Sequence, residues 1–208
     1  MSSEPTGGAA DGQVAILLFA AGASKRMGGA DKLLQEIDGV PILRRQAQAA
    51  IASGAPVIAL LPVDRPARHG ALAGLALQKV SVADAALGMS ASFRAGIKAL
   101  PKGAEAAIMM LADMPEIETA DIARLIAAWR DAPLRPARLC GPADQPGSPV
   151  LFPARFFEAL ARIEGDEGGR SVLRGQEITR VPCPDARALI DLDTPEDWAA
   201  WRAKNPRR

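Results

Sequence analysis

Apolar segments alternate with mixed segments along the chain, and this alternation predicts strands separated by helices. Continuous apolar runs bounded by Gly, Pro or polar residues are typical of strands that are buried on both faces of a sheet. Residues 14–21 and 106–111 form two runs of this kind, and the other candidate strands are shorter or contain more polar residues. The predicted strands cover residues 14–21, 57–61, 78–82, 106–111, 149–152, 178–181 and 188–190.

Between these strands, apolar residues recur with the spacing of a helix face. The first predicted helix follows an Asp38-Gly39 turn, begins at Pro41 and ends at Gly54. A second helix begins near Ser90 and stops before Pro101. Later helices are expected after an N-cap at Thr119, near Phe156, shortly after the Gly-rich stretch 165–169, and after a cap at Thr194.

Strands and helices that alternate at this pitch predict one three-layer α/β domain. The sheet should be mostly parallel, or mixed, with helices on both faces. We assign residues 13–204 to this domain, and we interpret residues 1–12 as a disordered lead-in. The Pro-rich stretch 133–149 is interpreted as a long functional loop within the domain.

The composition is that of an ordinary globular protein and narrows the choice of partners. The formal net charge is +1, so no global field would attract nucleic acid or an anionic membrane. Cys140 and Cys183 are too few for a disulfide framework or a cysteine zinc site; we expect two buried thiols, with a single disulfide as the alternative. The chain begins without a secretory signal and contains no apolar run that would span a bilayer, which predicts a cytoplasmic protein.

The loop at residues 20–32 (AAGASKRMGGADK) is the first candidate for chemistry. It follows the first buried strand, and in a parallel sheet ligands gather at the carboxyl ends of strands. Its glycines allow backbone N–H groups to approach an anion, and its cations add local positive charge. These residues are Gly22, Gly28, Gly29, Lys25, Arg26 and Lys32. The pattern favours a triphosphate-binding loop, and the alternative is a solvated loop with surface cations.

Carboxylates follow two other predicted strands. Asp113 comes directly after the run 106–111, and Asp191 and Asp193 come after 188–190, on one side of an extended segment. Carboxylate oxygens suit Mg²⁺, which takes one or two of them together with substrate phosphates. The alternative to metal binding is capping, of a turn by Asp113 and of the helix after Thr194 by Asp193. Capping by Asp193 would still allow Asp191 to bind the metal.

Other catalytic groups are scarce in the sequence. The one histidine, His69, lies in a polar stretch where a surface loop is expected. No Ser/His/Asp or Cys/His set is recognisable, so we expect the substrate to supply the nucleophile. A phosphate monoester is largely dianionic at neutral pH and can serve as one, given cations to stabilise the transferring phosphate.

Six segments in order resemble the molybdenum-cofactor nucleotidyltransferases, and together they reach from about Val14 to Trp198. The first is FAAGASKRMGGADKLL, which contains the loop just described. The others are GMSASFRAG, LADMP, GSPVLF, GDEGGRSVL and DLDTPEDW. The resemblance implies a Rossmann-like nucleotidyltransferase fold and Mg²⁺-dependent transfer of a nucleotide from CTP or GTP to the terminal phosphate of molybdopterin, with release of pyrophosphate. Ala20-Ala21-Gly22 and GMSAS are more similar to the cytidylyl-transferring branch, while residues 28–32 are more similar to the guanylyl-transferring one.

The resemblance also implies roles for individual residues. Arg26 and Lys32 would hold the triphosphate, and the loop residues Ala20, Ala21, Gly22 and Ser24 would contact it closely. Asp113 would bind Mg²⁺, with Asp191 or Asp193 as a second ligand. The base would be bordered by Leu61, Pro62 and the segment from Ser90 to Ser92. The segment Gly147-Ser148-Pro149 would face the acceptor.

One departure leaves the acceptor open. Relatives commonly have histidine between the glycine and the proline, where this chain has Ser148. Another phosphorylated small molecule, such as a sugar phosphate, is therefore the alternative acceptor. A non-enzymatic alternative is a maturation partner that escorts the cofactor, and a molybdoenzyme or its chaperone is a candidate partner in either case.

Overall fold

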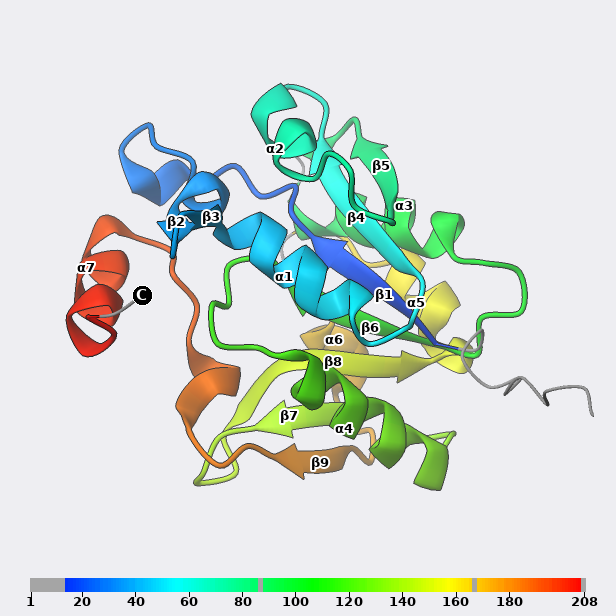
Figure 1. The fold of residues 1–208 in the computed structure, drawn as a ribbon. Coiled ribbons are helices and arrows are strands. Elements are labelled where there is room, and N and C mark those ends of the chain that lie inside the picture. Colours follow the sequence, from blue (N-terminus) through cyan, green and yellow to red (C-terminus); the bar gives the residue numbers. More distant parts are fainter. Residues whose placement is uncertain (1–13, 86–87, 166–167, 207–208) are drawn as a thin grey trace, which may run out of the picture.

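The computed structural model describes residues 14–85, 88–165 and 168–206, and the predicted lead-in lies outside them. Within this part, the core of the fold is one sheet of seven strands in the order β5-β4-β1-β6-β8-β7-β9 (Figure 1). The strands are β1 (Val14–Phe19), β4 (Val57–Pro62), β5 (Gln78–Val82), β6 (Ala106–Leu111), β7 (Ala137–Cys140), β8 (Pro146–Pro153) and β9 (Thr179–Pro182).

The strand directions make the sheet mixed but mostly parallel, as predicted. β1 pairs in parallel with β4 and β6, β4 with β5, and β7 with β9. β8 runs antiparallel to both of its neighbours, β6 and β7. Because β1, β4 and β6 point the same way, the loops that follow them meet at one edge of the sheet.

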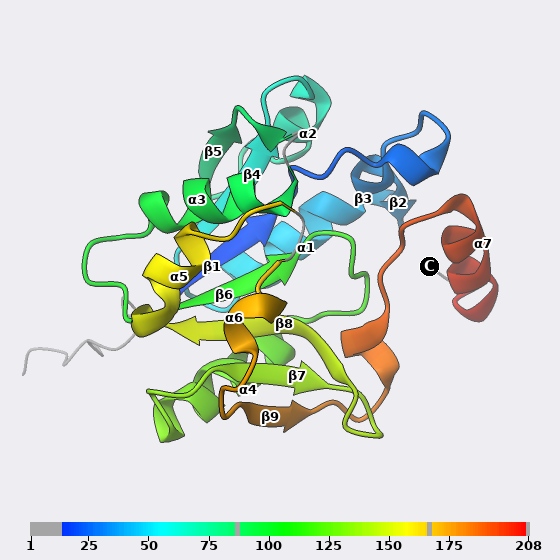
Figure 2. The same cartoon turned by 180° about the vertical axis from the view of Figure 1, so that it is seen from behind.

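Helices cover both faces of the sheet, which explains why β1 is buried along its whole length. On one face lie α1 (Ile42–Ile51), α2 (Pro66–Ala71) and α4 (Thr119–Asp131), whereas α7 (Pro195–Lys204) stands beyond the edge of the sheet (Figure 1). The opposite face carries α3 (Met89–Ala99), α5 (Phe157–Ala161) and α6 (Arg170–Leu173), as Figure 2 shows from behind. Each face has its own apolar cluster, so the prediction of a three-layer α/β domain is confirmed.

One loop prediction and one strand prediction are wrong. The stretch 133–149 is not a long loop, because it contains β7 and the start of β8. Residues 188–190 do not form a strand; the segment Ala186–Leu189 is a 3-10 helix, η5. The Asp185 side chain accepts a hydrogen bond from the Arg187 N–H and so stabilises this turn.

Of the predictions for single residues, the one for Thr194 is confirmed and those for Thr119 and His69 are wrong. Thr194 caps α7 as predicted, with Asp197 completing a capping box. Thr119 is not the cap of α4, because Glu118 holds that position and the Thr119 hydroxyl donates to the Ala49 carbonyl in α1. His69 lies in α2, where its Nε2 is 3.0 Å from the Pro62 carbonyl oxygen, and not in the surface loop that we expected.

A short hairpin and several 3-10 helices lie outside the main sheet and its covering helices. A hairpin of β2 (Glu36–Ile37) and β3 (Val40–Pro41) turns at the predicted Asp38-Gly39. The remaining 3-10 helices are η1 (Lys25–Met27), η2 (Lys32–Leu34) and η4 (Ala154–Phe156). Cys140 and Cys183 are free and buried, as expected. Among the described residues, no helix combines the length and the apolar character needed to cross a membrane.

Gly147 in β8 gives a direct test of how η5 packs on the sheet. A Cβ at this position would lie 2.4 Å from the Ala188 carbonyl oxygen and 2.7 Å from the Ala188 Cβ. Because backbone would have to move, we expect Gly147→Ala to lower the free energy of unfolding by about 1–3 kcal/mol in denaturant titration. The matched control is Gly70→Ala in α2, where a Cβ meets nothing within 4 Å. A Gly147 variant as stable as the Gly70 variant would contradict this packing.

Candidate active site

A cavity of about 500 Å³ lies at the carboxyl edge of β1 and β6. Four segments line it: the loop after β1, the start of α3, the residues after β6, and the segment that leads into α7. From the predicted set it contains Ala21, Gly22, Ser24, Arg26, Lys32, Ser92, Asp113, Asp191 and Asp193. The structure therefore brings the three predicted polar segments to one place.

The loop after β1 has a backbone suited to anions. Gly28 and Gly29 have φ values of 59° and 102°, in the region that favours glycine. The N–H groups of residues 22 to 24 have no hydrogen-bond partner in the described part of the chain. Three consecutive unpaired donors beside a cavity can bind the oxygens of a phosphate chain.

Lys32 connects the loop to the acids on the other side of the cavity. Its Nζ is 2.5 Å from Asp113 Oδ2 and 2.5 Å from Asp193 Oδ1. Arg26 adds a second contact, 2.5 Å from its Nη2 to Asp193 Oδ2. The side chains of Lys32 and Asp113 are only 13% and 15% exposed, whereas that of Arg26 is 68% exposed. Lys32 is thus the central cation of the site.

Backbone hydrogen bonds fix the acids relative to the sheet. The Ala112 N–H donates to the Phe19 carbonyl, which ties the end of β6 to the end of β1. The Leu192 N–H donates to the Asp113 carbonyl and holds the segment before α7 against β6. Leu192 is buried while Asp191 and Asp193 line the cavity, so they share one side as predicted, although no strand precedes them.

Three carboxylates, of Asp113, Asp191 and Asp193, line this side of the cavity. Burial, followed by the charges of Asp113 and Asp193, raises the pKa of Asp191. Burial acts to lower the pKa of Lys32, but its contacts with Asp113 and Asp193 outweigh this and raise it. Lys32 is therefore cationic at neutral pH, and Asp191 remains without a cation of its own among these contacts.

One buried carboxylate oxygen of the site, Asp113 Oδ1, has no hydrogen-bond partner among the described residues. A buried carboxylate oxygen without a partner is unfavourable, and carboxylate oxygen is the ligand that Mg²⁺ and Mn²⁺ accept. In the described part of the chain, no three acidic, His or Cys side chains are grouped closely enough to hold a metal by themselves. A metal here would need oxygens from a substrate as well.

The base of the loop rests on an arginine that sequence reasoning missed. Arg68, in α2, is completely buried. Its Nη1 donates to the carbonyls of Ala20 and Gly22 at 2.6 and 2.8 Å, and its Nη2 donates to Ser24 Oγ at 2.9 Å. Its Nε and Nη2 also contact both carboxylate oxygens of Asp31, at 2.7 and 2.8 Å. Arg68 thus fixes both ends of the loop.

The pKa of Asp31 reflects this contact. Burial acts to raise the pKa, but the hydrogen bonds and charge of Arg68 outweigh it and hold the pKa below the ordinary 3.8. Arg68 also accounts for Ser24, whose φ of 53° is unusual for a residue other than glycine. The sequence held one signal: an acid in a loop that binds anions requires a cationic partner.

Five predicted contact residues lie outside the lining of the cavity. Ala20 is buried beneath it, and Leu61, Pro62 and Ser90 are buried as well, so their side chains do not border it. Ser148 lies in β8, two strands from β1. The lining also includes Lys25, one of the predicted loop cations, and residues that we did not single out: Phe19, Ala23, Leu33, Ala85, Gly88, Met89 and Leu111.

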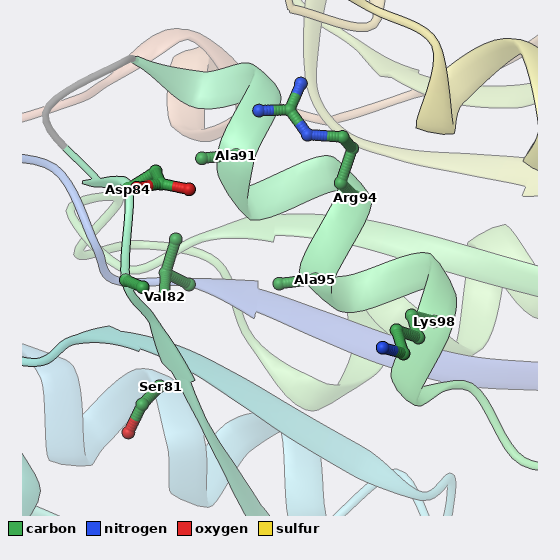
Figure 3. A pocket seen from close by; sticks show the side chains of 8 residues that line it. Ser81, Val82, Asp84, Ala91, Arg94, Ala95 and Lys98 are labelled. Carbon is green, nitrogen blue, oxygen red and sulfur yellow. The ribbon is translucent and has the colours of Figure 1, made fainter.

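A second hollow of about 210 Å³ lies between the end of β5 and α3 (Figure 3). Arg94 and Lys98 project from α3 beside it, and Asp84 approaches from the strand side. Both cations are exposed, and the labelled side chains surround the hollow without converging on one point. It contains none of the predicted site residues, so we assign the chemistry to the larger cavity.

Comparison with known proteins identifies relatives of the chain and of its fold. The family model described as a MobA-like NTP transferase domain matches residues 16–181. The purine catabolism protein PucB of Bacillus subtilis is 29% identical over 55% of this chain and 56% of its own, so the match spans little more than half of that relative. The nicotine blue oxidoreductase of Paenarthrobacter nicotinovorans is 27% identical over 86% of this chain and 92% of its own. The crystal structure of an Rv0371c homologue from Mycobacterium sp. strain JC1 is 28% identical, covers 94% of this chain and 98% of its own, and superposes with a TM-score of 0.82.

Proposed function

This chain belongs to the family of MobA-like NTP transferase domains, and on that premise we propose that it transfers CMP from CTP to the terminal phosphate of molybdopterin. The family and the fold make it a nucleotidyltransferase that acts on an NTP and a small-molecule acceptor. The observation that carries the proposal is Lys32, which contacts Asp113 and Asp193 in the cavity formed by the loop after β1. The preference for CTP is supported by Ala20-Ala21-Gly22 and GMSAS, which resemble the cytidylyl branch.

The reaction is a displacement at the α-phosphorus. An oxygen of the acceptor phosphate forms a bond to that phosphorus, and the bond to the bridging oxygen of the β-phosphate breaks. Pyrophosphate leaves with the electron pair of the broken bond. The acceptor phosphate is largely dianionic at neutral pH, so no proton has to be removed from the nucleophile. Lys32 and Arg26 supply positive charge where negative charge develops, and the unpaired N–H groups of residues 22 to 24 hold the phosphate chain.

The residues present fit a divalent metal. Asp113, with its unpartnered Oδ1, and Asp191 or Asp193 would hold it together with substrate phosphate oxygens. Such an ion supplies charge neutralisation at the phosphates. The Rv0371c protein of Mycobacterium tuberculosis has been crystallised in complex with manganese. For this chain, release of Asp113 and Asp193 from Lys32 would accompany the arrival of the nucleotide and the metal.

Nucleotide preference can be measured without knowing the acceptor. We expect CTP with Mg²⁺ to raise the melting temperature more than GTP, UTP or ATP, because a ligand that binds the folded form stabilises it by RT ln(1 + [L]/Kd). At a concentration of 100 Kd this amounts to about 2.7 kcal/mol. Equal shifts for all four nucleotides, or a larger shift with GTP, would contradict the CTP assignment while leaving nucleotidyl transfer in place.

Ser148 supports a second candidate acceptor. It stands where relatives commonly have histidine, in the segment that we expect to face the acceptor. We therefore keep transfer to another phosphorylated small molecule, such as a sugar phosphate, as the alternative. Pyrophosphate release measured with CTP and molybdopterin, and then with a panel of sugar phosphates, separates the two.

A further inference from the structure

We propose that Arg138 in β7 and Arg170 in α6 bind an anionic group of the acceptor substrate, on the part of the sheet that continues from the nucleotide cavity. The inference rests on the proposed function, because it assigns the acceptor side of the same reaction. Neither residue lines the nucleotide cavity.

The strand register places Arg138 on the α3 side of the sheet. Met109 in β6 pairs with Val150 in β8, and Val150 pairs with Arg138. Met109 and Val150 belong to the apolar cluster beneath α3 and α5. Residues that pair across neighbouring strands point to the same face of a sheet, so the Arg138 side chain leaves the strand on this face as well. Two residues further along β6 is Leu111, which lines the nucleotide cavity. Two residues back along β8 is Ser148, so one continuous face runs from the cavity past Ser148 to Arg138.

Arg170 lies at the start of α6, which packs against the same face of the sheet. Its neighbour Gly169 packs so closely on β8 that a Cβ there would be 2.9 Å from Cζ of Phe152. Phe152 shares the face of Val150, and Figure 2 shows α6 lying over β8 on this side. Arg170 therefore stands over the strands that carry Ser148 and Arg138.

Neither arginine is neutralised by the described part of the chain. Arg138 is half-buried, and its Nε donates to the Gly147 carbonyl oxygen at 2.7 Å. Its two terminal nitrogens have no partner among the described residues, and Arg170 has no hydrogen bond or ion pair there. A third arginine, Arg180 in β9, forms an ion pair with Asp144 in the loop between β7 and β8, and this pair partly neutralises its charge.

The electrostatics of the cluster favour a bound anion. Burial, followed by the charge of Arg170, lowers the pKa of Arg138, and Arg180 contributes in the same direction. Like charges near one another on a half-buried surface are unfavourable, and a bound anion relieves their repulsion. Two guanidinium groups offer the paired donors that match a phosphate or carboxylate, which makes a phosphorylated or carboxylated acceptor the fitting class.

The position also fits the geometry of the reaction. Neighbouring strands are about 4.8 Å apart, so the β7 backbone lies roughly 10 Å from β6, which carries Asp113 at its end. An acceptor anchored at Arg138 and Arg170 would extend across Ser148 and reach the nucleotide. This explains why Ser148 can face the acceptor without lining the nucleotide cavity.

The test uses inorganic phosphate as the probe. The full chain is first saturated with CTP and Mg²⁺, so that the triphosphate site is occupied, and phosphate is then titrated at constant ionic strength by calorimetry. We expect Arg138→Ala and Arg170→Ala each to weaken phosphate binding by roughly 10-fold to 100-fold, the range for a hydrogen bond to a charged group. Arg138→Lys should retain part of the affinity.

Two comparisons keep the result specific. Arg162→Ala removes an exposed cation that directly follows α5, on the same side of the sheet, and should leave phosphate binding unchanged. Binding of CTP with Mg²⁺ by each variant reports on the nucleotide site alone, so failure of the proposed function is recognised separately. Arg170 is exposed and has no partner among the described residues, so we expect its variant to stay folded even if the Arg138 variant does not. Unchanged phosphate affinity in Arg170→Ala, or no phosphate binding by the wild type, would overturn the proposal.

Discussion

Replacing Lys32 by alanine should lower kcat for pyrophosphate release by about 100-fold, the largest effect expected for any single cation of the site. The loss of one preorganised charge at the transferring phosphate corresponds to roughly 3 kcal/mol of transition-state stabilisation. Lys32 is nearly buried and contacts two carboxylates, so its charge is poorly screened by solvent. Arg26 is 68% exposed, and Arg26→Ala should therefore have a smaller effect.

The Lys32 prediction is measured by steady-state pyrophosphate release at saturating CTP and Mg²⁺. Lys102→Ala, an exposed lysine outside the cavity, is the control and should retain wild-type turnover. Lys32→Arg keeps the charge and should recover part of the rate. If Lys32→Ala retained more than a third of the wild-type kcat, the assignment of Lys32 to the transferring phosphate would be wrong.

A substitution at Asp113, assayed for function in cells, separates an enzyme from a cofactor-escorting partner. Asp113→Asn removes the charge of the proposed metal ligand while keeping its size, so nucleotidyl transfer should be lost. A protein that only escorts the cofactor would keep its function in cells with this substitution. Wild-type performance of Asp113→Asn in such an assay would therefore count against the enzyme.

Much of the fold was predictable because burial on both faces leaves a plain pattern in the sequence. The predicted boundaries of β5 and β6 match the observed strands, and β4 differs by one residue. β7 escaped prediction because its four residues include Arg138 and are flanked by prolines, so no continuous apolar run marks it. The wrong strand at 188–190 has the opposite origin: three apolar residues were read as extended, whereas the Asp185 cap and packing on Gly147 favour a 3-10 turn.

The site was predictable as far as topology dictates it. The carboxyl ends of parallel strands share one edge, so Lys32 and Asp113 could be placed together from their positions after β1 and β6. Contacts to the base and the acceptor do not follow from topology in this way, and the assignment of Leu61 and Ser90 to the base stays a prediction, since both lie outside the lining of the cavity. Those contacts depend on where side chains point in three dimensions, and neither spacing nor composition encodes this directly.

Arg68 marks the limit of prediction most clearly. A charged residue in a polar stretch is typical of a surface position, and only its contacts with Asp31 and the loop carbonyls explain its complete burial. Arg68 in α2 and Asp31 in the loop are 37 residues apart in the sequence. Such a pair is visible only in the folded chain.

Arg68→Ala should lower the free energy of unfolding by about 3–5 kcal/mol, the effect expected when one partner of a buried ion pair is removed. The substitution leaves the Asp31 carboxylate and the loop carbonyls without their donor. The measurement is urea denaturation at neutral pH. The control is Arg65→Ala, whose side chain is 33% exposed and reaches Asp31 only at 3.4 Å, and it should lower stability by about 1 kcal/mol or less.

The pH dependence distinguishes a lost ion pair from lost packing. Arg68 holds the pKa of Asp31 below 3.8, so this carboxylate stabilises the fold above its unfolded pKa, and the stabilisation is lost as pH falls through the folded pKa. The difference in unfolding free energy between wild type and Arg68→Ala should therefore be largest at neutral pH and shrink below about pH 4. A difference that stayed constant from pH 7 to pH 3 would show that Arg68 acts through packing, and the electrostatic account of the loop would fail.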